Sequence, residues 1–241
     1  MGPERREVTA EIPYLSIIVP TLNEAGGIAA ALGRLAPFRG QAEVIVVDGG
    51  SEDATAQIAR PMADRVVDAP RGRARQMNAG AAVAKGDVLV FLHADTILPD
   101  GAPTAIREGL EATLRPWGRF DVAIASADPL LAAVATLMNL RSRWSGIATG
   151  DQAIFVLRET FVAVGGYPDI PLMEDVALSE RLRALAAPIC LRDRVVTSAR
   201  RWERHGVLRT IVLMWRLRFA YAMGVDPHRL ARRYDVERSS S

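Results

Sequence analysis

The sequence predicts an α/β protein with a Rossmann-like, mostly parallel central sheet, flanked by helices and followed by a basic helical segment. Three observations lead to this prediction. The first half of the chain alternates short apolar runs with helical stretches, the apolar runs are continuous, and arginines gather toward the C-terminus. Strands that are apolar throughout are typical of parallel sheets covered by helices on both faces.

Four buried strands are expected in the first hundred residues. Each is a short, largely apolar run bounded by turn-forming or charged residues. The runs are residues 15–20, 43–48, 65–68 and 87–92. Helical patterns separate them, at residues 23–35, 51–63 and 73–84. In such sheets, ligands bind outside the carboxyl ends of the strands.

The second half is less regular. Helices are expected at residues 102–114, 129–140 and 174–186, and strands at 119–125 and 152–157. The apolar stretch at 129–140 is too short to cross a bilayer.

A long apolar segment covers residues 207–225, but Arg209, Arg216 and Arg218 interrupt it. Charged side chains make it a poor transmembrane span. It fits either a helix packed on the domain or one lying at a membrane surface.

Size and composition indicate an ordinary globular protein. The 241 residues are enough for one large domain or two small ones, with 49% hydrophobic and 24% charged residues. The single cysteine, Cys190, excludes an internal disulfide and fits a reducing cytosol. The first seven residues lack the apolar core of a signal peptide. We therefore expect a cytoplasmic protein.

Charge is distributed unevenly. From residue 181 onward there are 14 arginines against five acids, whereas the preceding part holds 16 bases and 23 acids. A basic end suggests an anionic partner such as nucleic acid, an anionic membrane surface or a phosphate-bearing substrate, and a solvated basic helix is the alternative.

Polar residues follow the predicted strands. Asp48 ends one strand and precedes two glycines, which allow a ligand to approach the backbone closely. It could hydrogen-bond a sugar or base, or simply form an Asx turn. His93 and Asp95 end another strand, where a carboxylate suits a hard divalent cation.

Two further features suggest chemistry. Arg71 and Arg75 lie at the start of a predicted helix, and a helix N-terminus with arginines favours anions. Glu174 and Asp175 are adjacent acids in an apolar stretch after a glycine-rich turn. Because a desolvated carboxylate is costly, such a pair points to a general base rather than to stability.

Six segments stand in a fixed order along the chain. They are Ile17-Ile18-Val19-Pro20-Thr21-Leu22-Asn23-Glu24, Val46-Val47-Asp48-Gly49-Gly50-Ser51-Glu52-Asp53-Ala54-Thr55, Asn78-Ala79-Gly80 with Gly86-Asp87, Phe91-Leu92-His93-Ala94-Asp95, Gly165-Gly166-Tyr167 and Glu174-Asp175. In this order and spacing they resemble family 2 glycosyltransferases of the GT-A fold, over roughly residues 15–190.

The resemblance implies an inverting transfer of sugar from a UDP- or GDP-linked donor to an acceptor hydroxyl. The residues it implies for the nucleotide sugar are Pro20, Leu22, Glu24 and Asp48, and we add Arg71, Arg75, Asn78 and His93. Asp95 would hold a divalent metal, Mn²⁺ or Mg²⁺, in the family's DxD motif, of which His93 replaces the first Asp. Asp175 corresponds to the catalytic base, with Glu174 orienting it or the acceptor.

Later segments resemble a narrower bacterial subgroup associated with radical-SAM genes and arsenosugar biosynthesis. They are Gly150-Asp151-Gln152-Ala153, Pro171-Leu172-Met173-Glu174-Asp175-Val176 and Thr197-Ser198-Ala199-Arg200-Arg201-Trp202. The acceptor side is expected at Asp151, Gln152, Arg201 and Trp202.

The expected organisation is an N-terminal extension at 1–13, a glycosyltransferase domain at 14–204 and a helical tail at 205–241. Within the domain, the nucleotide half runs to about residue 100 and the acceptor half from about 101. The partners expected are a nucleoside-diphosphate sugar, an unidentified acceptor and, through the tail, the inner membrane surface, but not nucleic acid.

Two rival functions compete with this one. A sugar-phosphate nucleotidyltransferase would carry a basic loop after the first strand, but the only lysine is Lys85 and residues 23–27 contain no base. A non-enzymatic protein that binds a membrane surface or a partner would use the basic tail and would bind no nucleotide.

Overall fold

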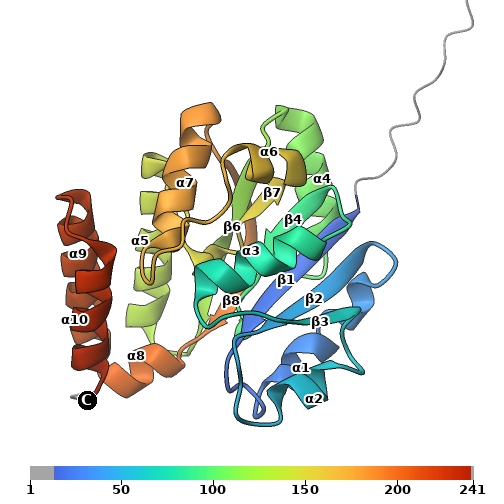
Figure 1. Ribbon diagram of the computed structural model, residues 1–241. Coiled ribbons are helices and arrows are strands. Elements are labelled where there is room, and N and C mark those ends of the chain that lie inside the picture. The colour runs from blue at the N-terminus through green and yellow to red at the C-terminus, as the bar shows by residue number, and fades with distance from the viewer. Residues whose placement is uncertain (1–13, 240–241) are drawn as a thin grey trace, which may run out of the picture.

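A computed structural model gives the structure of residues 14–239, apart from the side chains at positions 201, 205 and 235–239 (Figure 1). Within these residues, one eight-stranded sheet has the strand order β3-β2-β1-β4-β7-β6-β8-β5. The strands are β1 (Leu15–Thr21), β2 (Ala42–Asp48), β3 (Arg65–Asp68), β4 (Val88–Phe91), β5 (Thr96–Ile97), β6 (Trp117–Ala125), β7 (Phe155–Leu157) and β8 (Ile189–Ser198).

Helices separate and cover the strands. The α-helices are α1 (Ile28–Gly33), α2 (Thr55–Ala59), α3 (Arg73–Val83), α4 (Ala102–Thr113), α5 (Pro129–Ser145), α6 (Arg158–Ala163), α7 (Glu174–Leu185), α8 (Arg200–His205), α9 (Val207–Ala222) and α10 (Pro227–Ser239). Two 3₁₀ turns are η1 (Ala36–Phe38) and η2 (Gly150–Gln152).

The four strands at the N-terminal side are mutually parallel, as predicted. Strand β7 runs antiparallel to both β4 and β6, and β5 runs antiparallel to β8. Strands β6 and β8 pair in parallel. The fold class is therefore confirmed, and the reversal at β7 joins the nucleotide-side strands to a second group of strands.

Two apolar layers cover the sheet because successive strand residues point to opposite faces. Ile17 and Val19 pack with Ile28 of α1 and Ile106 of α4 on one face. Ile18 faces the other layer. That layer contains residues of α3, α6 and α7, the helices that cross in front of the sheet in Figure 1.

The predicted helix at 23–35 is wrong in its first turns, because the structure begins α1 only at Ile28. Asn23 adopts a left-handed backbone with φ of 54°, which cannot continue a helix. The helix predicted at 51–63 shortens to α2 for a similar reason. Asp48 accepts hydrogen bonds from the backbone of Gly50 and Ser51, so this stretch is a turn.

Strand β8 was not predicted. Its centre carries Arg192, Asp193 and Arg194, which break the apolar pattern that marks a buried strand. The pairing register between β6 and β8 shifts between Phe120 and Asp121, as at a β-bulge. The charged residues lie at this irregularity, so they need not be buried.

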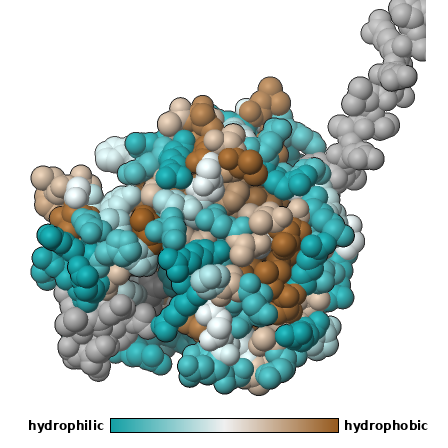
Figure 2. All heavy atoms as spheres, viewed as in Figure 1, coloured by the Kyte–Doolittle hydropathy of each residue, from teal (hydrophilic) through white to brown (hydrophobic). Residues whose placement is uncertain are grey.

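The C-terminal helices pack on the domain. Leu217 of α9 and Leu230 of α10 are buried against Met173 and Val176, around the start of α7. The opposite side of α9 exposes Leu208, Val212, Trp215 and Phe219, and Met223, directly after the helix, is also exposed. On the face of the molecule shown in Figure 2, hydrophilic side chains predominate and hydrophobic ones form separate patches. No helix within residues 14–239 combines the length and apolarity needed to cross a bilayer.

Candidate active site at the strand ends

The loops after β1 and β2 are tied together by hydrogen bonds. The backbone N–H of Asn23 donates to Ser51 Oγ at 2.9 Å, and that of Glu24 donates to Thr55 Oγ1 at 2.8 Å. The side chain of Asn23 in turn accepts from the backbone of Glu52 at 2.8 Å. These contacts join the loop after β2 to the segment that carries Pro20, Leu22 and Glu24, three of the predicted nucleotide residues, which form a rim at the sheet edge.

Asp48 is buried beneath this rim. Its carboxylate accepts backbone N–H bonds from Gly50 and Ser51 at 3.2 and 2.8 Å, and Ser51 Oγ donates to it at 2.5 Å. Asp48 therefore forms the Asx turn that the sequence left open as an alternative. The turn fixes the loop on which a nucleoside would rest.

Nothing in the local sequence indicates the role of Gln76. Its Nε2 donates to the backbone carbonyls of Thr21 and Val47 at 2.8 and 2.9 Å. A Cβ atom on Gly49 would lie 2.9 Å from the same amide. Gln76 thus holds the ends of β1 and β2, and only glycine fits beside it.

The arginines at the start of α3 have different surroundings. Arg71 is exposed, whereas Arg75 Nε pairs with Asp169 at 2.8 Å on the surface. Arg73, which had not been selected, lies close enough to Glu174 to lower the pKa of that carboxyl. Helix α3 therefore directs one of its arginines toward the acid pair.

Asn78 ties α3 to the glycine-rich turn. Its Nδ2 donates to the backbone carbonyl of Tyr167 at 2.8 Å, and its Oδ1 accepts from the backbone N–H of Tyr167 at 3.0 Å. Both polar atoms of the side chain are thus committed to the turn that precedes Glu174 and Asp175.

His93 contacts the loop of η2 at the end of β4. Its Nδ1 lies 3.3 Å from Asp151 Oδ1. Its ring lies against Gly150, where an added Cβ would come within 2.4 Å of Nε2. This contact links His93 of the nucleotide side to Asp151 of the acceptor side, two residues selected separately from the sequence.

Asp95 and Glu24 approach the same cation. Arg200 Nη2 lies 3.9 Å from Asp95 Oδ2 and 3.9 Å from Glu24 Oε2. Burial raises the pKa of Glu24, and Asp95 adds to the rise while Arg200 opposes it. Arg200 was not selected as a site residue, because nothing in its local sequence indicates that it reaches the strand ends.

Within the described residues, no group of three or more His, Cys, Asp or Glu side chains is arranged to hold a metal ion. Mg²⁺ is commonly bound by one or two carboxylates together with substrate phosphates. Asp95 and Glu24, which approach one guanidinium nitrogen, fit that mode of binding.

The acid pair opens helix α7. Met173 precedes it in a left-handed conformation with φ of 70°. Asp175 is half-buried and accepts a hydrogen bond from the backbone N–H of Gly150 at 2.8 Å. Asp175 therefore remains accessible, in a fixed orientation, beside the loop that contacts His93.

Glu174 is more deeply buried, with 6% of its surface exposed. Burial raises its pKa to about 7, with a further contribution from the charge of Asp175. The buried Tyr167 faces the same pair, and its pKa is raised by burial and by both acids. Glu174 is therefore partly protonated near neutral pH.

The remaining acceptor-side residues differ in accessibility. Gln152 is fully buried, and its Oε1 accepts from the backbone N–H of Thr149 at 3.2 Å. Trp202 is half-buried against residues of β6 and α5. The side chain of Arg201 lies outside the described residues. Gln152 thus supports the loop that carries Asp151.

Comparison with known proteins agrees with this architecture. Residues 16–122 match the family model described as Glycosyl transferase family 2. Probable glycosyltransferase YdaM of Bacillus subtilis (strain 168) is 27% identical over 248 aligned residues, which cover 92% of this chain and 57% of that protein. PGL/p-HBAD biosynthesis glycosyltransferase of Mycobacterium bovis (strain BCG / Pasteur 1173P2) is 31% identical, covering 64% of this chain and 63% of that protein. The chain thus spans less than two thirds of the length of these relatives.

Solved structures share the fold at low identity. S. aureus TarS 1–349 superposes with a TM-score of 0.65 and 18% identity, covering 77% of this chain and 60% of that one. The mannosyltransferase PcManGT from Pyrobaculum calidifontis, solved with GDP-Man and Mn²⁺, has a TM-score of 0.62 and 21% identity. The match covers 86% of this chain and 65% of that one. The chain therefore has the GT-A fold, and its residues 16–122 are similar to glycosyl transferase family 2.

Proposed function

We propose that this chain is an inverting glycosyltransferase that moves a sugar from a UDP- or GDP-linked donor to an acceptor hydroxyl. The main support is the contact series from His93 through Asp151 and Gly150 to Asp175, which joins the strand ends to the acid pair. The family match covers the nucleotide-side strands, and the fold neighbours include TarS with UDP-GlcNAc and PcManGT with GDP-Man.

In the proposed reaction, the donor lies across the rim formed by Pro20, Leu22 and Glu24. Asp175 accepts the proton of the acceptor hydroxyl as its oxygen attacks the anomeric carbon from the face opposite the diphosphate. The bond to the diphosphate breaks in the same step, and the anomeric configuration inverts. The 2.8 Å hydrogen bond from Gly150 keeps the carboxylate oriented toward the acceptor.

Asp95, with Glu24 beside it, would hold a divalent metal, Mn²⁺ or Mg²⁺. When bound, the ion supplies charge neutralisation for the departing diphosphate. Structures of other proteins with this fold contain Mn²⁺ or Mg²⁺, which agrees with this assignment.

The experiment that tests the function is a screen of UDP- and GDP-linked sugars for hydrolysis, with Mn²⁺ and Mg²⁺ compared. Calorimetry with UDP and GDP separates this function from a non-enzymatic role, because a basic tail alone would not discriminate between nucleotides. If neither nucleotide binds in the presence of metal, the proposed function is wrong.

We also propose that the enzyme is cytoplasmic and contacts the inner membrane surface through α9. The exposed apolar side chains of α9 recur at helical spacing, and Arg209 and Arg216 lie next to them. An apolar strip with flanking arginines suits an anionic lipid interface. Trp215→Glu should abolish co-sedimentation with anionic vesicles, and unchanged binding would contradict this contact.

Membership in the radical-SAM-associated arsenosugar subgroup remains part of the proposal. The three segments that resemble it correspond to the loop of η2, the start of α7 and the start of α8. Assay of the enzyme with arsenic-containing sugar precursors tests this point.

A further inference from the structure

Arg141 carries buried polar atoms that have no partner. It lies one turn before the end of α5, and its Nε and Nη2 are buried without a hydrogen bond among the described residues. Leaving a buried donor unpaired destabilises a fold, and more so when the donor is charged. Because its unpaired buried donors destabilise the fold, Arg141 is a candidate for binding a ligand.

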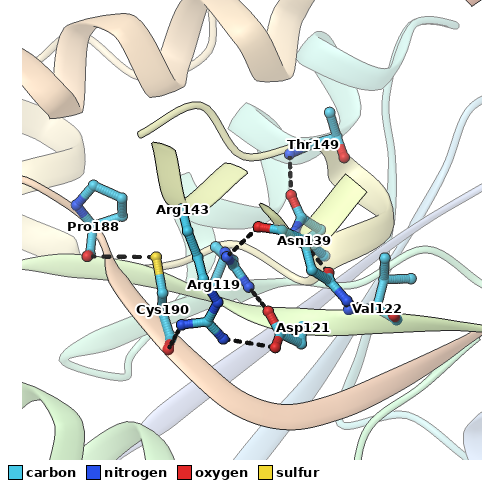
Figure 3. A network of polar contacts seen from close by, with 9 residues as sticks. Arg119, Asp121, Val122, Asn139, Arg143, Thr149, Pro188 and Cys190 are labelled. Atoms are coloured by element: carbon cyan, nitrogen blue, oxygen red, sulfur yellow. Dashed lines mark hydrogen bonds and ion pairs between the residues drawn. The ribbon is translucent and has the colours of Figure 1, made fainter. Parts of the chain in front are cut away.

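The neighbouring arginines Arg119 and Arg143 both pair with Asp121, as Figure 3 shows, although Nε of Arg119 is also buried without a hydrogen bond. Arg119 pairs with Asp121, and its Nη2 donates to the backbone carbonyl of Asn139 at 3.3 Å. Arg143 Nη2 donates to the other oxygen of Asp121 at 2.6 Å. Both oxygens of Asp121 are therefore committed, and this carboxylate does not neutralise Arg141.

A second arginine lies beside Arg141. Val134 and Met138 of α5 share an apolar cluster with Ile211 of α9. Arg141 follows Met138 on the same face of α5, and Arg218 follows Ile211 by seven residues on the same face of α9. The two half-buried guanidinium groups thus extend from one helix contact and lie close enough to affect each other.

This arginine pair adjoins the acid pair. Leu217, next to Arg218, is buried against Met173 and Val176, on either side of Glu174 and Asp175. Burial and Arg218 lower the pKa of Arg141 to about 10, whereas Asp175 opposes that shift. At this pKa, Arg141 stays charged at neutral pH. Positive charge therefore lies beside the carboxylate assigned as base.

We propose that Arg141 and Arg218 bind a phosphate group of the acceptor, so that the acceptor is a phosphorylated alcohol whose hydroxyl reaches Asp175. A phosphate group carries nearly two negative charges at neutral pH, whereas a carboxylate carries one. Two guanidinium groups therefore match the charge of a phosphate better than that of a carboxylate. This inference rests on the proposed function, because it identifies the substrate class that binds beside its base.

Direct binding can be tested with inorganic phosphate as the probe. Thermal melting of the full chain is compared in phosphate and in chloride at equal ionic strength, for wild type, Arg141→Met and Arg218→Gln. Phosphate should stabilise the wild type, and each variant should need at least roughly tenfold more phosphate for the same shift. The matched control is Arg232→Gln, an exposed arginine on the neighbouring helix α10, which should behave as wild type.

Stability in the absence of phosphate gives a second measurement. Arg141→Met removes an unpaired buried charge and should therefore melt at a higher temperature than wild type in chloride buffer. If Arg141→Met melts at a lower temperature and still responds to phosphate as wild type does, the arginine is structural and the proposal is wrong. A wild type without any phosphate response overturns it too.

Acceptor assays identify the source of the phosphate. Glycerol phosphate in solution, vesicles containing a lipid phosphate, and the corresponding unphosphorylated alcohols are compared as acceptors. Transfer that requires both the phosphate group and Arg141 supports the proposal, in solution or on vesicles. Equal transfer to the unphosphorylated compounds overturns it.

Titration of UDP and GDP separates this inference from the proposed function. Absent nucleotide binding counts against the glycosyltransferase function, whereas nucleotide binding without a phosphate response counts only against this inference.

Discussion

The backbone N–H of Gly150 donates a 2.8 Å hydrogen bond to Oδ2 of Asp175, connecting the η2 loop to the first turn of α7. Asp151, the next residue, lies 3.3 Å from His93 at the end of β4. Two loops far apart in sequence thus meet at one edge of the sheet. In the proposed reaction, this connection would position the base on α7 relative to a donor bound at the strand ends.

Asp175→Asn should reduce sugar transfer by roughly 10²- to 10⁴-fold, because an amide cannot accept the proton of the acceptor hydroxyl. Nucleotide binding should change little, since the rim residues are distant in sequence and bonded among themselves. The measurement is kcat for transfer together with calorimetric titration of UDP or GDP. Glu180→Gln, an exposed acid on the same helix, is the control. Transfer at the wild-type rate by Asp175→Asn would show that the base lies elsewhere.

Glu174→Gln should stabilise the protein at pH 8 and have little effect at pH 4. The pKa of Glu174 is raised from 4.5 to about 7 in the folded state, so the folded protein retains a proton that the unfolded chain loses. Stability therefore falls as pH rises from about 4.5 to 7, by at most about 3 kcal/mol from a shift of this size. Urea unfolding at several pH values measures it. A variant whose stability differs from that of wild type by the same amount at every pH would show that this titration is absent.

Much of the site follows from the sequence because its residues lie where strands end. The segments of Asp48 and Asp95 each predict a site residue, and the structure places both at the carboxyl edge of the parallel strands. The contacts of Gly150 with Asp175 and of Arg200 with Asp95 could not be predicted, because they join segments that only the fold brings together. The local sequence indicates where a strand or helix ends, whereas tertiary packing determines which of these ends lie close together.

The same limit applies to the roles of individual side chains. Asn78 was selected for the donor, yet its amide binds the backbone of Tyr167. Gln76, two residues earlier, bridges the strand ends and had no sequence signal. Amides are often used inside proteins to satisfy backbone groups, and their residue type alone does not separate that use from ligand binding.

His93→Asp, which restores the acid usual in the DxD motif, should destabilise this protein. A carboxylate at this position would face Asp151, which now lies 3.3 Å from the His93 ring, and like charges at that distance repel. Adding Asp151→Asn should recover most of the loss, because it removes one of the two charges. Melting temperatures of the two single variants and the double variant form a double-mutant cycle. Strict additivity would show that the two side chains do not interact.

Arg200→Ala should increase the affinity for Mn²⁺. Arg200 Nη2 lies 3.9 Å from both Asp95 and Glu24, so its positive charge competes with a metal ion for the same carboxylates. The arginine side chain is largely exposed, so solvent weakens the competition and we expect a change of only about two- to fivefold. Titration of Mn²⁺ in the presence of UDP or GDP measures it, and the difference between variant and wild type should shrink as salt is added. Arg204→Ala, an exposed arginine on the same helix, is the control. Weaker Mn²⁺ binding in Arg200→Ala would mean that the arginine supports the metal site rather than competing for it, because removing a repulsive charge can only strengthen cation binding.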